Sequence, residues 1–419
     1  MEPVISAFKE LIAMPASLFQ TPNGERLQIG IFGSRNAGKS SLINALAGQP
    51  LSIVSDQKGT TTDPVQKAME LLPIGPVVLI DTPGLDDDSA LGPQRIAQTR
   101  SILRKANLAL LVFDGTIGMN ASDQKLLQTL QAEAIPYLLV ANKCDAPNFL
   151  PTPEHAVAVS AQTGCHLSTL KEQIIACYQK ELQPKQEAAV LLGDLVKPGD
   201  CVVLVTPIDT SAPKGRLILP QVQAIRDLLD HQACCLVTQP QQLPQMLKLL
   251  RQPPKLVVTD SQVFESVQKI VPDSIPLTSF SILFARYKGI LQQAVQGAFA
   301  LKQLPEGATI LIAEGCTHHR QCEDIGTVKL PKWIQAYTKK QFQFQWCSGT
   351  FFPEDLSDIQ LVVHCGGCML PAKEVTARQA LAKQYAVPFT NYGILIAYLN
   401  GILSRSLAVF PDDFSNQLQ

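Results

Sequence analysis

The chain has 419 residues and a formal net charge of −1, with 35 basic and 36 acidic side chains, which predicts two to four domains and argues against a nucleic-acid or acidic-membrane partner. The first residues lack a basic region followed by a long apolar run, and the apolar stretches are too short to span a bilayer. Because eleven cysteines without an export signal favour reduced thiols, some of them metal ligands, over disulfides, we expect a soluble cytoplasmic protein.

A phosphate-binding loop is predicted close to the N-terminus. Leu27–Phe32 is a short apolar run typical of a strand, Ser41–Ala47 has helical composition, and the sequence GSRNAGKS lies between them at residues 33–40. This strand–loop–helix order is the context that a P-loop requires, because the loop amides and the helix N-terminus surround the phosphates. We therefore expect the nucleotide to contact Gly33, Asn36, Ala37, Gly38, Lys39, Ser40 and Ser41.

Groups that hold magnesium are predicted next along the chain. Val77–Ile80 is a strand-like run that ends at Asp81, whose carboxylate would hold the ion together with the Ser40 hydroxyl. A switch threonine belongs in the segment GTTTD, residues 59–63, where we favour Thr61 as a magnesium ligand without excluding Thr60 or Thr62. The predicted catalytic residues are Lys39, Ser40, Thr61, Asp81 and Gly84.

A base-recognition motif follows the strand-like run Leu138–Ala141. The Asp145 carboxylate can accept two hydrogen bonds from N1 and the exocyclic amine of guanine. Adenine offers no such pair, so we expect GTP rather than ATP. A backbone N–H after a further predicted strand would complete the pocket. The predicted base-recognition residues are Asn142, Lys143, Asp145, Ser160 and Ala161.

The N-terminal region resembles the Era and MnmE branch of translation-factor-class small GTPases. In MnmE-like members the residue at the position of Asn36 helps to bind potassium, which takes the place of an arginine finger, so the resemblance implies a potassium ion at Asn36. Leu85 stands where Ras-like proteins have a water-orienting glutamine, and residues 90–95 lack the glutamate that positions water in MnmE-like proteins. We therefore expect slow, potassium-stimulated hydrolysis of GTP to GDP and phosphate.

Strands and helices alternate beyond a polar linker at residues 182–189, a pattern typical of βαβ units and a parallel sheet. A sheet of three strands would expose its edges, so we expect homodimerisation and rank it above a ligand-binding role. Cys201, Cys234 and Cys235 read as core thiols. The predicted strands are Val202–Thr206, Ala233–Thr238 and Leu256–Asp260, the predicted helices are Leu219–Leu229, Leu243–Leu250 and Ser261–Ile270, and a hinge at 272–276 precedes a long helix at about 280–304.

Two groups of cysteine and histidine residues follow predicted strands of the C-terminal segment. Ala308–Ala313 leads to Cys316-Thr317-His318, and Ile359–Val363 leads to His364-Cys365-Gly366-Gly367-Cys368. Since ligands bind at the carboxyl edge of open parallel sheets, we expect the two loops to meet there. Three thiolates with histidine suit structural zinc, and they suit a cubane iron–sulfur cluster with one iron lacking a thiolate equally well.

Several residues are candidates for the remaining contacts of this metal site. His318 and His364 would either ligate the metal or hydrogen-bond the sulfurs. Cys322 and Cys347 are possible fourth ligands, although ordinary packing explains each of them better.

The combination of these motifs resembles the HydF family, the GTPases of iron-only (FeFe) hydrogenase maturation, over essentially the whole chain. The resemblance implies a 4Fe-4S cluster on Cys316, Cys365 and Cys368. It also implies a scaffold that receives a transient diiron precursor made with the radical-SAM maturases HydE and HydG and delivers it to apo-(FeFe) hydrogenase. The fourth cluster ligand stays open between histidine, a carboxylate, water and an exogenous group; the candidates for an exchangeable carboxylate are Glu314, Glu323 and Asp324.

We predict an α/β protein with an N-terminal P-loop GTPase domain and two further α/β domains that have mainly parallel sheets. The expected boundaries are 1–182 for the GTPase domain, 190–272 for the dimerisation domain and 276–419 for the cluster-binding domain. The alternative function is an RNA-modification or ribosome-assembly GTPase with structural zinc, which the lack of a basic stripe with interleaved aromatics disfavours. A third class is a redox enzyme that uses the cluster for electron transfer.

Overall fold

The structure, a computed structural model, describes residues 25–48, 65–82, 92–184, 190–208, 217–315, 325–349 and 351–410. The chain divides into two compact units, Met1–Gln183 and Pro184–Gln419. The predicted α/β class is confirmed, because helices connect mainly parallel strands in both units. Within the described ranges, no helix has both the length and the apolar character needed to cross a bilayer.

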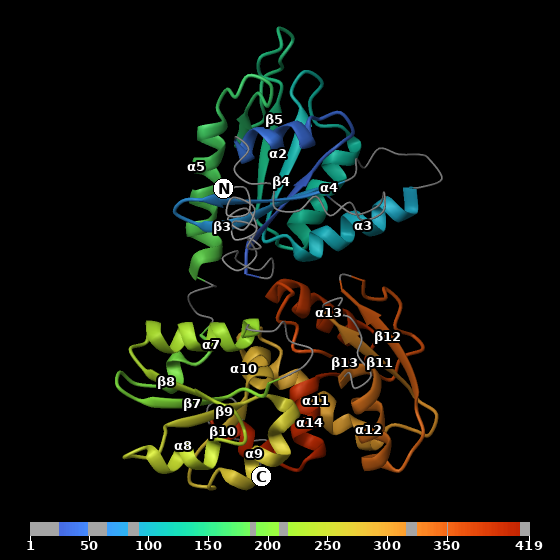
Figure 1. Ribbon diagram of the computed structural model, residues 1–419. Coiled ribbons are helices and arrows are strands. Elements are labelled where there is room, and N and C mark those ends of the chain that lie inside the picture. The colour runs from blue at the N-terminus through green and yellow to red at the C-terminus, as the bar shows by residue number, and fades with distance from the viewer. Residues whose placement is uncertain are drawn as a thin grey trace, which may run out of the picture. The chain divides into compact units, whose positions relative to one another are not determined.

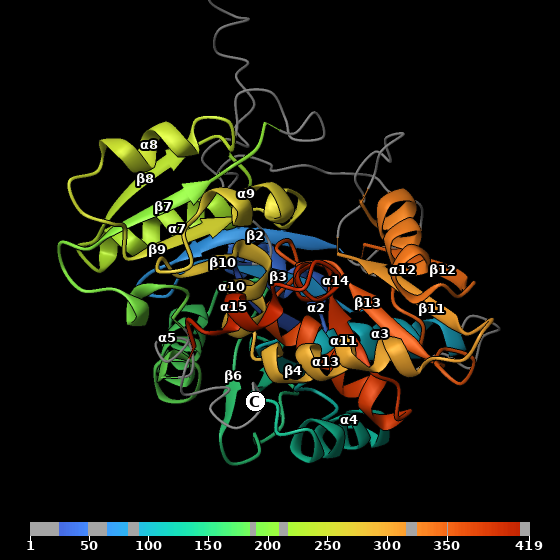
Figure 2. The same cartoon turned by 90° about the horizontal axis from the view of Figure 1, so that it is seen from below.

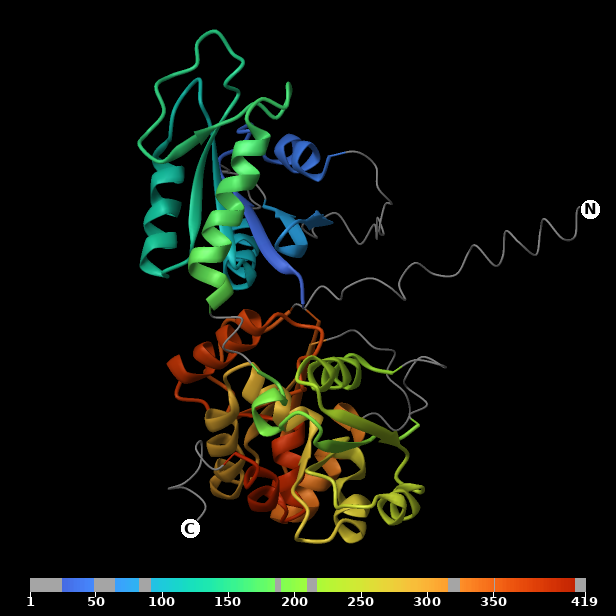
Figure 3. The same cartoon turned by 90° about the vertical axis from the view of Figure 1, so that its left-hand side faces the viewer.

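The first unit contains a six-stranded sheet in the order β2-β3-β1-β4-β5-β6, parallel except at the edge strand β2. One apolar core packs α2 and α5 on one face, and a second packs α3 and α4 on the other (Figure 3). The strands are β1 (Leu27–Phe32), β2 (Gln66–Leu71), β3 (Gly75–Asp81), β4 (Leu108–Asp114), β5 (Tyr137–Asn142) and β6 (Ala156–Ala158). The helices are α2 (Lys39–Ala47), α3 (Gly92–Lys105), α4 (Ala121–Ala132), α5 (Leu167–Cys177) and the π-helical turn Tyr178–Leu182.

The second unit contains two four-stranded parallel sheets, in the orders β10-β9-β7-β8 and β12-β11-β13-β14. The helices α10, α11 and α14 lie between them and share one apolar core (Figures 1 and 2). The strands are β7 (Cys201–Val205), β8 (Cys234–Thr238), β9 (Leu256–Thr259), β10 (Leu277–Ser279), β11 (Thr309–Glu314), β12 (Gln343–Ser348), β13 (Leu361–His364) and β14 (Phe389–Asn391). The helices are α7 (Leu219–Asp230), α8 (Leu243–Leu249), α9 (Phe264–Ile270), α10 (Phe280–Tyr287), α11 (Leu291–Ala300), α12 (Leu330–Thr338), α13 (Ala372–Gln384), α14 (Tyr392–Leu399) and α15 (Leu403–Leu407), with short 3-10 or π turns at Gly193–Leu195, Ser261–Val263, Leu301–Gln303 and Ile325–Lys329.

The two sheets of the second unit repeat one topology. With the strands of each sheet counted in chain order, the first strand pairs with the second on one side and with the third on the other, and the fourth strand pairs with the third. The sequence PLTSFSILFARYKGIL at residues 276–291 also matches PFTNYGILIAYLNGIL at residues 388–403, each being a last strand followed by a helix. Ser279 and Asn391 cap these helices at equivalent positions, accepting from the N–H groups of Ile282 and Ile394. The second unit is therefore an internal duplication.

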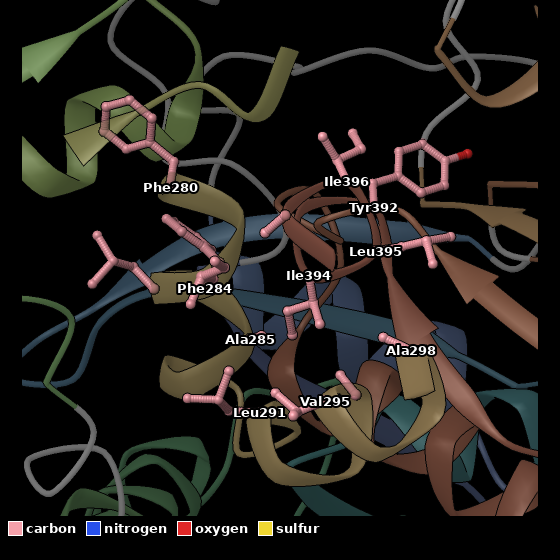
Figure 4. Packing of buried hydrophobic residues seen from close by; sticks show 14 of the residues in the cluster. Phe280, Phe284, Ala285, Leu291, Val295, Ala298, Tyr392, Ile394, Leu395 and Ile396 are labelled. Atoms are coloured by element: carbon pink, nitrogen blue, oxygen red, sulfur yellow. The ribbon is translucent and has the colours of Figure 1, made fainter. Parts of the chain in front are cut away.

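The central helices α10 and α14 pack where the two repeats meet. A Cβ added to Gly393 would lie 2.3 Å from Cβ of Ser281, and Ser281 is the matched residue of the other repeat. The helices thus approach closely enough to require glycine at this crossing. Figure 4 shows the apolar side chains that α10, α11 and α14 contribute around it, among them Phe284, Val295 and Ile394.

Three predicted features of the second unit differ from the structure. The long helix expected at about 280–304 is two helices, because the chain turns at Gly289, whose φ of 74° is in the left-handed region. The three-stranded sheet expected in the middle segment has a fourth strand, β10. The strands β12 and β14 were not predicted, although β12 alternates polar and apolar residues over its first four positions; β14 has only three residues, too few to form a pattern.

Candidate functional site

The first candidate site is the loop between β1 and α2. Lys39 is buried, and its Nζ donates to the carbonyl oxygens of Gly33 at 2.9 Å and Ser34 at 2.8 Å. Gly33 and Gly38 have positive φ values. A Cβ added to Gly33 would lie only 1.9 Å from the carbonyl oxygen of Val112. Glycine is required at both positions, so the loop backbone is fixed at the N-terminus of α2 where phosphate would bind.

The end of β3 brings a carboxylate to the start of α2. The Ser40 hydroxyl donates to Asp81 Oδ2 at 2.5 Å. The other carboxylate oxygen, Oδ1, is buried and has no hydrogen-bond partner among the described residues. A hydroxyl and a carboxylate oxygen are hard donors of the kind that magnesium takes, so this pair fits the ion. Thr61 and Gly84, the other predicted catalytic residues, lie outside the described residues.

Asn142 connects the three loops predicted to bind the nucleotide. Its Nδ2 donates to the Ala37 carbonyl at 2.9 Å, and its Oδ1 accepts from the Ala161 N–H at 3.0 Å. A Cβ added to Gly38 would lie 2.2 Å from Asn142 Nδ2, which gives a second reason for glycine there. Asn36 and Asp145 have exposed side chains on two of these loops, Ser41 is exposed in the first turn of α2, and Ser160 is buried.

Two carboxylates that were not predicted from the sequence support this site. Asp114, at the end of β4, pairs with Lys143, and although partial burial acts to raise the pKa of Asp114, hydrogen bonds from Lys143 and Thr116 hold that pKa below its usual value. Asp123 forms a capping box with Asn120 at the start of α4, and its Oδ1 accepts from the Ser34 hydroxyl at 2.6 Å. The signal for Asp123 in the sequence is the N-cap pattern Asn-x-x-Asp.

The second candidate site lies at the carboxyl ends of β11 and β13. These strands are neighbours, with Ala313 opposite His364. The Gly315 N–H, just beyond β11, donates to Cys365 Sγ at 3.0 Å, and the Gly367 N–H donates to the same sulfur at 3.3 Å. The residue directly before Cys316 is therefore in contact with Cys365, as expected if the two loops meet. Five of the residues predicted for this site lie outside the described residues: Cys316, His318, Cys322, Glu323 and Asp324.

His364 is fully buried between protein partners. Its Nδ1 lies 2.7 Å from the Cys365 carbonyl and must donate, since a carbonyl only accepts. Its Nε2 lies 3.3 Å from an Arg378 nitrogen, which donates to it. Arg378 is itself buried and pairs with Glu374 at 2.9 Å. Both ring nitrogens are thus occupied by protein groups, and the ring stacks on Phe389.

A buried lysine anchors the loop that carries Cys365 and Cys368. Lys288 Nζ donates to the carbonyls of Gly367 and Leu370, the latter at 2.8 Å. Burial raises the pKa of Cys365 to about 11, with the two glycine N–H groups acting against it. Burial also raises the pKa of Cys368, and the charge of Lys288 acts against that shift. Sulfur ligation here would therefore deprotonate thiols that lie next to amide donors and an ammonium group.

Two further candidates flank Cys365. Glu314 ends β11, and its Oε1 accepts from the Tyr392 hydroxyl at 3.2 Å. Cys347 is buried in β12, and burial raises its pKa to about 11. The charges of Glu314 and Cys365 both act to raise the Cys347 pKa further, so the three groups lie close together.

Three family models match consecutive segments of the chain. Residues 28–143 match a model described as 50S ribosome-binding GTPase. Residues 191–289 match the hydrogen maturase F dimerization domain, and residues 292–409 match the hydrogen maturase F tetramerization domain.

Curated relatives match the N-terminal part alone. GTPase Der of Wolinella succinogenes is 36% identical over 170 residues, 36% of this chain and 36% of the relative. The tRNA modification GTPase MnmE of Synechococcus sp. (strain CC9605) is 40% identical over 151 residues, 36% of this chain and 33% of the relative. The chain thus spans about a third of the length of the curated relatives it matches.

Solved structures are more distant. A point variant of Aquifex aeolicus Era bound to GDP and aluminium fluoride is 21% identical, with 54% of this chain and 98% of that chain covered and a TM-score of 0.31. The G domain of the T. maritima FeoB iron transporter is 25% identical, with 36% and 99% covered and a TM-score of 0.29.

Proposed function

Because the chain belongs to the hydrogen maturase F family, we propose that it is a GTP-hydrolysing scaffold of (FeFe) hydrogenase maturation. It would hold a 4Fe-4S cluster, receive the diiron precursor of the H-cluster from HydE and HydG, and deliver it to the apo-hydrogenase in the cytoplasm. The observation that carries the proposal is the contact between Gly315 and Cys365. It joins the two cysteine loops at one sheet edge in a chain that also has a P-loop unit.

The GTPase part of the proposal rests on the first unit. The loop amides and Lys39 would bind the phosphates, and Ser40 with Asp81 would hold magnesium through the carboxylate oxygen that has no other partner among the described residues. Asn142 would fix the base-recognition loop against the P-loop, and Asp145 would select guanine. Potassium at Asn36 would supply positive charge to the transition state.

The cluster part of the proposal rests on the donor set in the second unit. Cys365 and Cys368 would ligate the cluster together with Cys316, and such clusters are held by cysteine thiolates. The N–H groups of Gly315 and Gly367 already point at the Cys365 sulfur, and Lys288 places positive charge beside the loop. His364 would act as a positioning residue for Cys365 rather than a ligand, because protein groups occupy both of its ring nitrogens. These residues fit an anionic iron–sulfur group.

The two units would have different roles in the proposed scaffold. We propose self-association through the segments 190–272 and 276–419, in keeping with the dimerization and tetramerization models that match there. GTP binding would change how partners dock, and the cluster would offer one iron without a thiolate as an attachment point. Bound nucleotide would not take part in chemistry at the cluster.

Anaerobic reconstitution with iron and sulfide tests this proposal. We expect wild type to gain a 4Fe-4S cluster, and Cys316→Ala, Cys365→Ala and Cys368→Ala each to lose most of its absorbance and its paramagnetic signal after reduction. Cys234→Ala is the matched control, since this thiol, which was wrongly predicted to lie in the core, is exposed on the other sheet of the same unit. Lys39→Ala should abolish GTP hydrolysis and keep the cluster.

The outcomes separate the proposal from its alternatives. A cluster spectrum that is unchanged in all three cysteine variants would refute the site. A colourless protein with one zinc ion and no iron after reconstitution would favour the RNA-modification or ribosome-assembly reading. Loss of the cluster in Lys39→Ala would contradict the separation between the two sites.

A further inference from the structure

Two thiols and one imidazole converge at the base-recognition loops, and neither site described above uses these three side chains. Cys144 follows the end of β5, and Cys165 and His166 directly precede α5. The ligand atoms of these three side chains all lie within 4.8 Å of one another. In the described part of the chain, no other three Cys, His, Asp or Glu side chains bring their ligand atoms together in this way.

Backbone hydrogen bonds hold both thiol-bearing loops to the same strand end. The Cys144 N–H donates to the Val159 carbonyl at 3.0 Å, and the Cys165 carbonyl accepts from the Ser160 N–H at 3.1 Å. Val159 and Ser160 are buried, so this anchor point is fixed in the core of the first unit. The approach of the two thiols is therefore set by the fold and not by chance contact of free side chains.

His166 is oriented as a metal ligand would be. Its Nδ1 lies 3.1 Å from the Ala158 carbonyl, and because a carbonyl only accepts, Nδ1 carries the proton and Nε2 keeps its lone pair. Histidine ligands usually donate their other N–H to a carbonyl or carboxylate in this manner. His166 also has a φ of 58°, a left-handed conformation that residues other than glycine seldom adopt unless their surroundings impose it.

We propose that Cys144, Cys165 and His166 bind a divalent metal ion of the zinc class, with the fourth coordination position open to solvent. Two thiolates and an imidazole are the donors that zinc takes in proteins. The exposure of Cys165 and His166 gives the ion access from solvent. The site belongs to the first unit, whereas Cys365 and Cys368 belong to the second, so the two metal sites are distinct.

The ion would connect the two loops that we propose recognise guanine. Cys144 lies between Lys143 and Asp145, and Cys165 is hydrogen-bonded to Ser160. A metal ion across these loops should raise the affinity for guanine nucleotide and thereby slow its release. By linkage, bound nucleotide should raise the affinity for the ion by the same factor by which the ion raises the affinity for nucleotide. This coupling rests on the proposed GTPase function, whereas metal binding itself does not.

Anaerobic titration of the full chain with cobalt(II) tests the site. Cys165→Ser and His166→Ala change exposed side chains, so both variants should fold. We expect each variant to lose one equivalent of bound cobalt and the absorption of a tetrahedral thiolate–cobalt site. The affinity of the site for cobalt should fall by at least about tenfold, because removal of even an outer-shell partner of a metal ligand lowers metal affinity by that much. Subtracting each variant's spectrum from that of wild type removes cobalt bound at other thiols.

His155→Ala is the matched control, because this histidine is exposed in the same unit and outside the group, and it should titrate like wild type. Equal cobalt stoichiometry in wild type and both site variants would overturn the site. Loss in Cys165→Ser with no change in His166→Ala would overturn the three-ligand assignment, as would a disulfide between Cys144 and Cys165 in the cobalt-treated protein.

Release of fluorescent GDP with and without zinc tests the coupling separately. We expect zinc to slow release from wild type and to have no effect on His166→Ala. Zinc that binds without changing the release rate would overturn the coupling and leave the metal site standing. A chain that binds the metal but no guanine nucleotide would instead refute the proposed GTPase function.

Discussion

His364 shows how strongly one buried side chain can depend on pH. Burial lowers its pKa to about 3, and the positive charge of Arg378 acts in the same direction. A histidine in an unfolded chain has a pKa of about 6.5. Between these values the unfolded chain binds more protons than the folded chain, so the free energy of unfolding falls as pH falls. The stabilisation is complete above about pH 6.5 and is lost as pH approaches about 3.

In the metal-free chain we expect His364 to remove about 1.4 kcal/mol of unfolding free energy per unit of falling pH within this window. His364→Gln should lack that part of the slope. Denaturant unfolding followed by tryptophan fluorescence measures it, since the chain has two tryptophans, Trp333 and Trp346, and both belong to the second unit. Equal slopes in the two chains between about pH 6.5 and about pH 5 would contradict the prediction.

Residues that act locally were predictable, and residues that act through tertiary contacts were not. Cys365 and Cys368 share one loop, and their spacing alone indicates a joint site. Lys288 bonds that loop from 79 residues away, and Arg378 reaches His364 from the next helix. Lys288 directly follows α10 and Arg378 lies in α13, both of which contain other cations, and such residues are usually solvated, so nothing local marks either one as buried.

At the scale of elements, Gly297 sets the distance between α11 and β14. A Cβ added there would lie 2.1 Å from the Phe389 carbonyl oxygen, which is backbone and cannot move aside cheaply. In an exposed helix Gly→Ala would stabilise the protein through helix propensity by up to about 1 kcal/mol. Here we expect Gly297→Ala to destabilise the second unit by about 1–3 kcal/mol, as overpacking does.

Tryptophan-detected unfolding checks this sign. Gln296→Ala is the matched control, because Gln296 is exposed on the same helix, and its effect should stay within about 0.5 kcal/mol. Stabilisation by Gly297→Ala would show that propensity outweighs the close approach. The comparison separates local helix preference from packing at one position of α11.

Element boundaries were predictable where the pattern is strong. β1 has the predicted bounds, because Leu27–Phe32 is a continuous apolar run between turn residues. β14 has only three residues and is a strand because it pairs with β13. No local sequence pattern reveals this pairing. The internal duplication of the second unit was not predicted. Both matching segments, 276–291 and 388–403, begin with Pro-x-Thr followed by Ser or Asn, but they lie more than a hundred residues apart in the chain.

At the scale of the whole molecule, both candidate sites lie at the carboxyl ends of parallel strands. The P-loop follows β1, and the cysteine loops follow β11 and β13. Parallel strands connected by helices place their loops at one edge, so residues far apart in sequence can form one site. This rule predicts that the cysteine loops meet, and the contact between Gly315 and Cys365 agrees with it at the described end of the first loop.

Self-association is the property of the whole molecule that sheet edges should control. β8 is the edge strand of its sheet and lies in the segment that matches the dimerization model, and Val237 on it is 42% exposed. A two-fold interface uses the same surface patch on both copies, so Val237→Lys would introduce one lysine on each of the two opposed strands. We expect Val237→Lys to weaken self-association by about tenfold, since like charges on opposed strands destabilise and apolar contact is lost.

Sedimentation over a range of concentrations measures this effect. Ile117→Lys is the control, because Ile117 is 74% exposed in the segment that matches the GTPase model, outside the two self-association segments. Its charge change is identical, so a non-specific effect of net charge would shift both variants equally. An unchanged association constant for Val237→Lys would place the dimer contact elsewhere than β8, on a surface of the second unit that does not use this sheet edge.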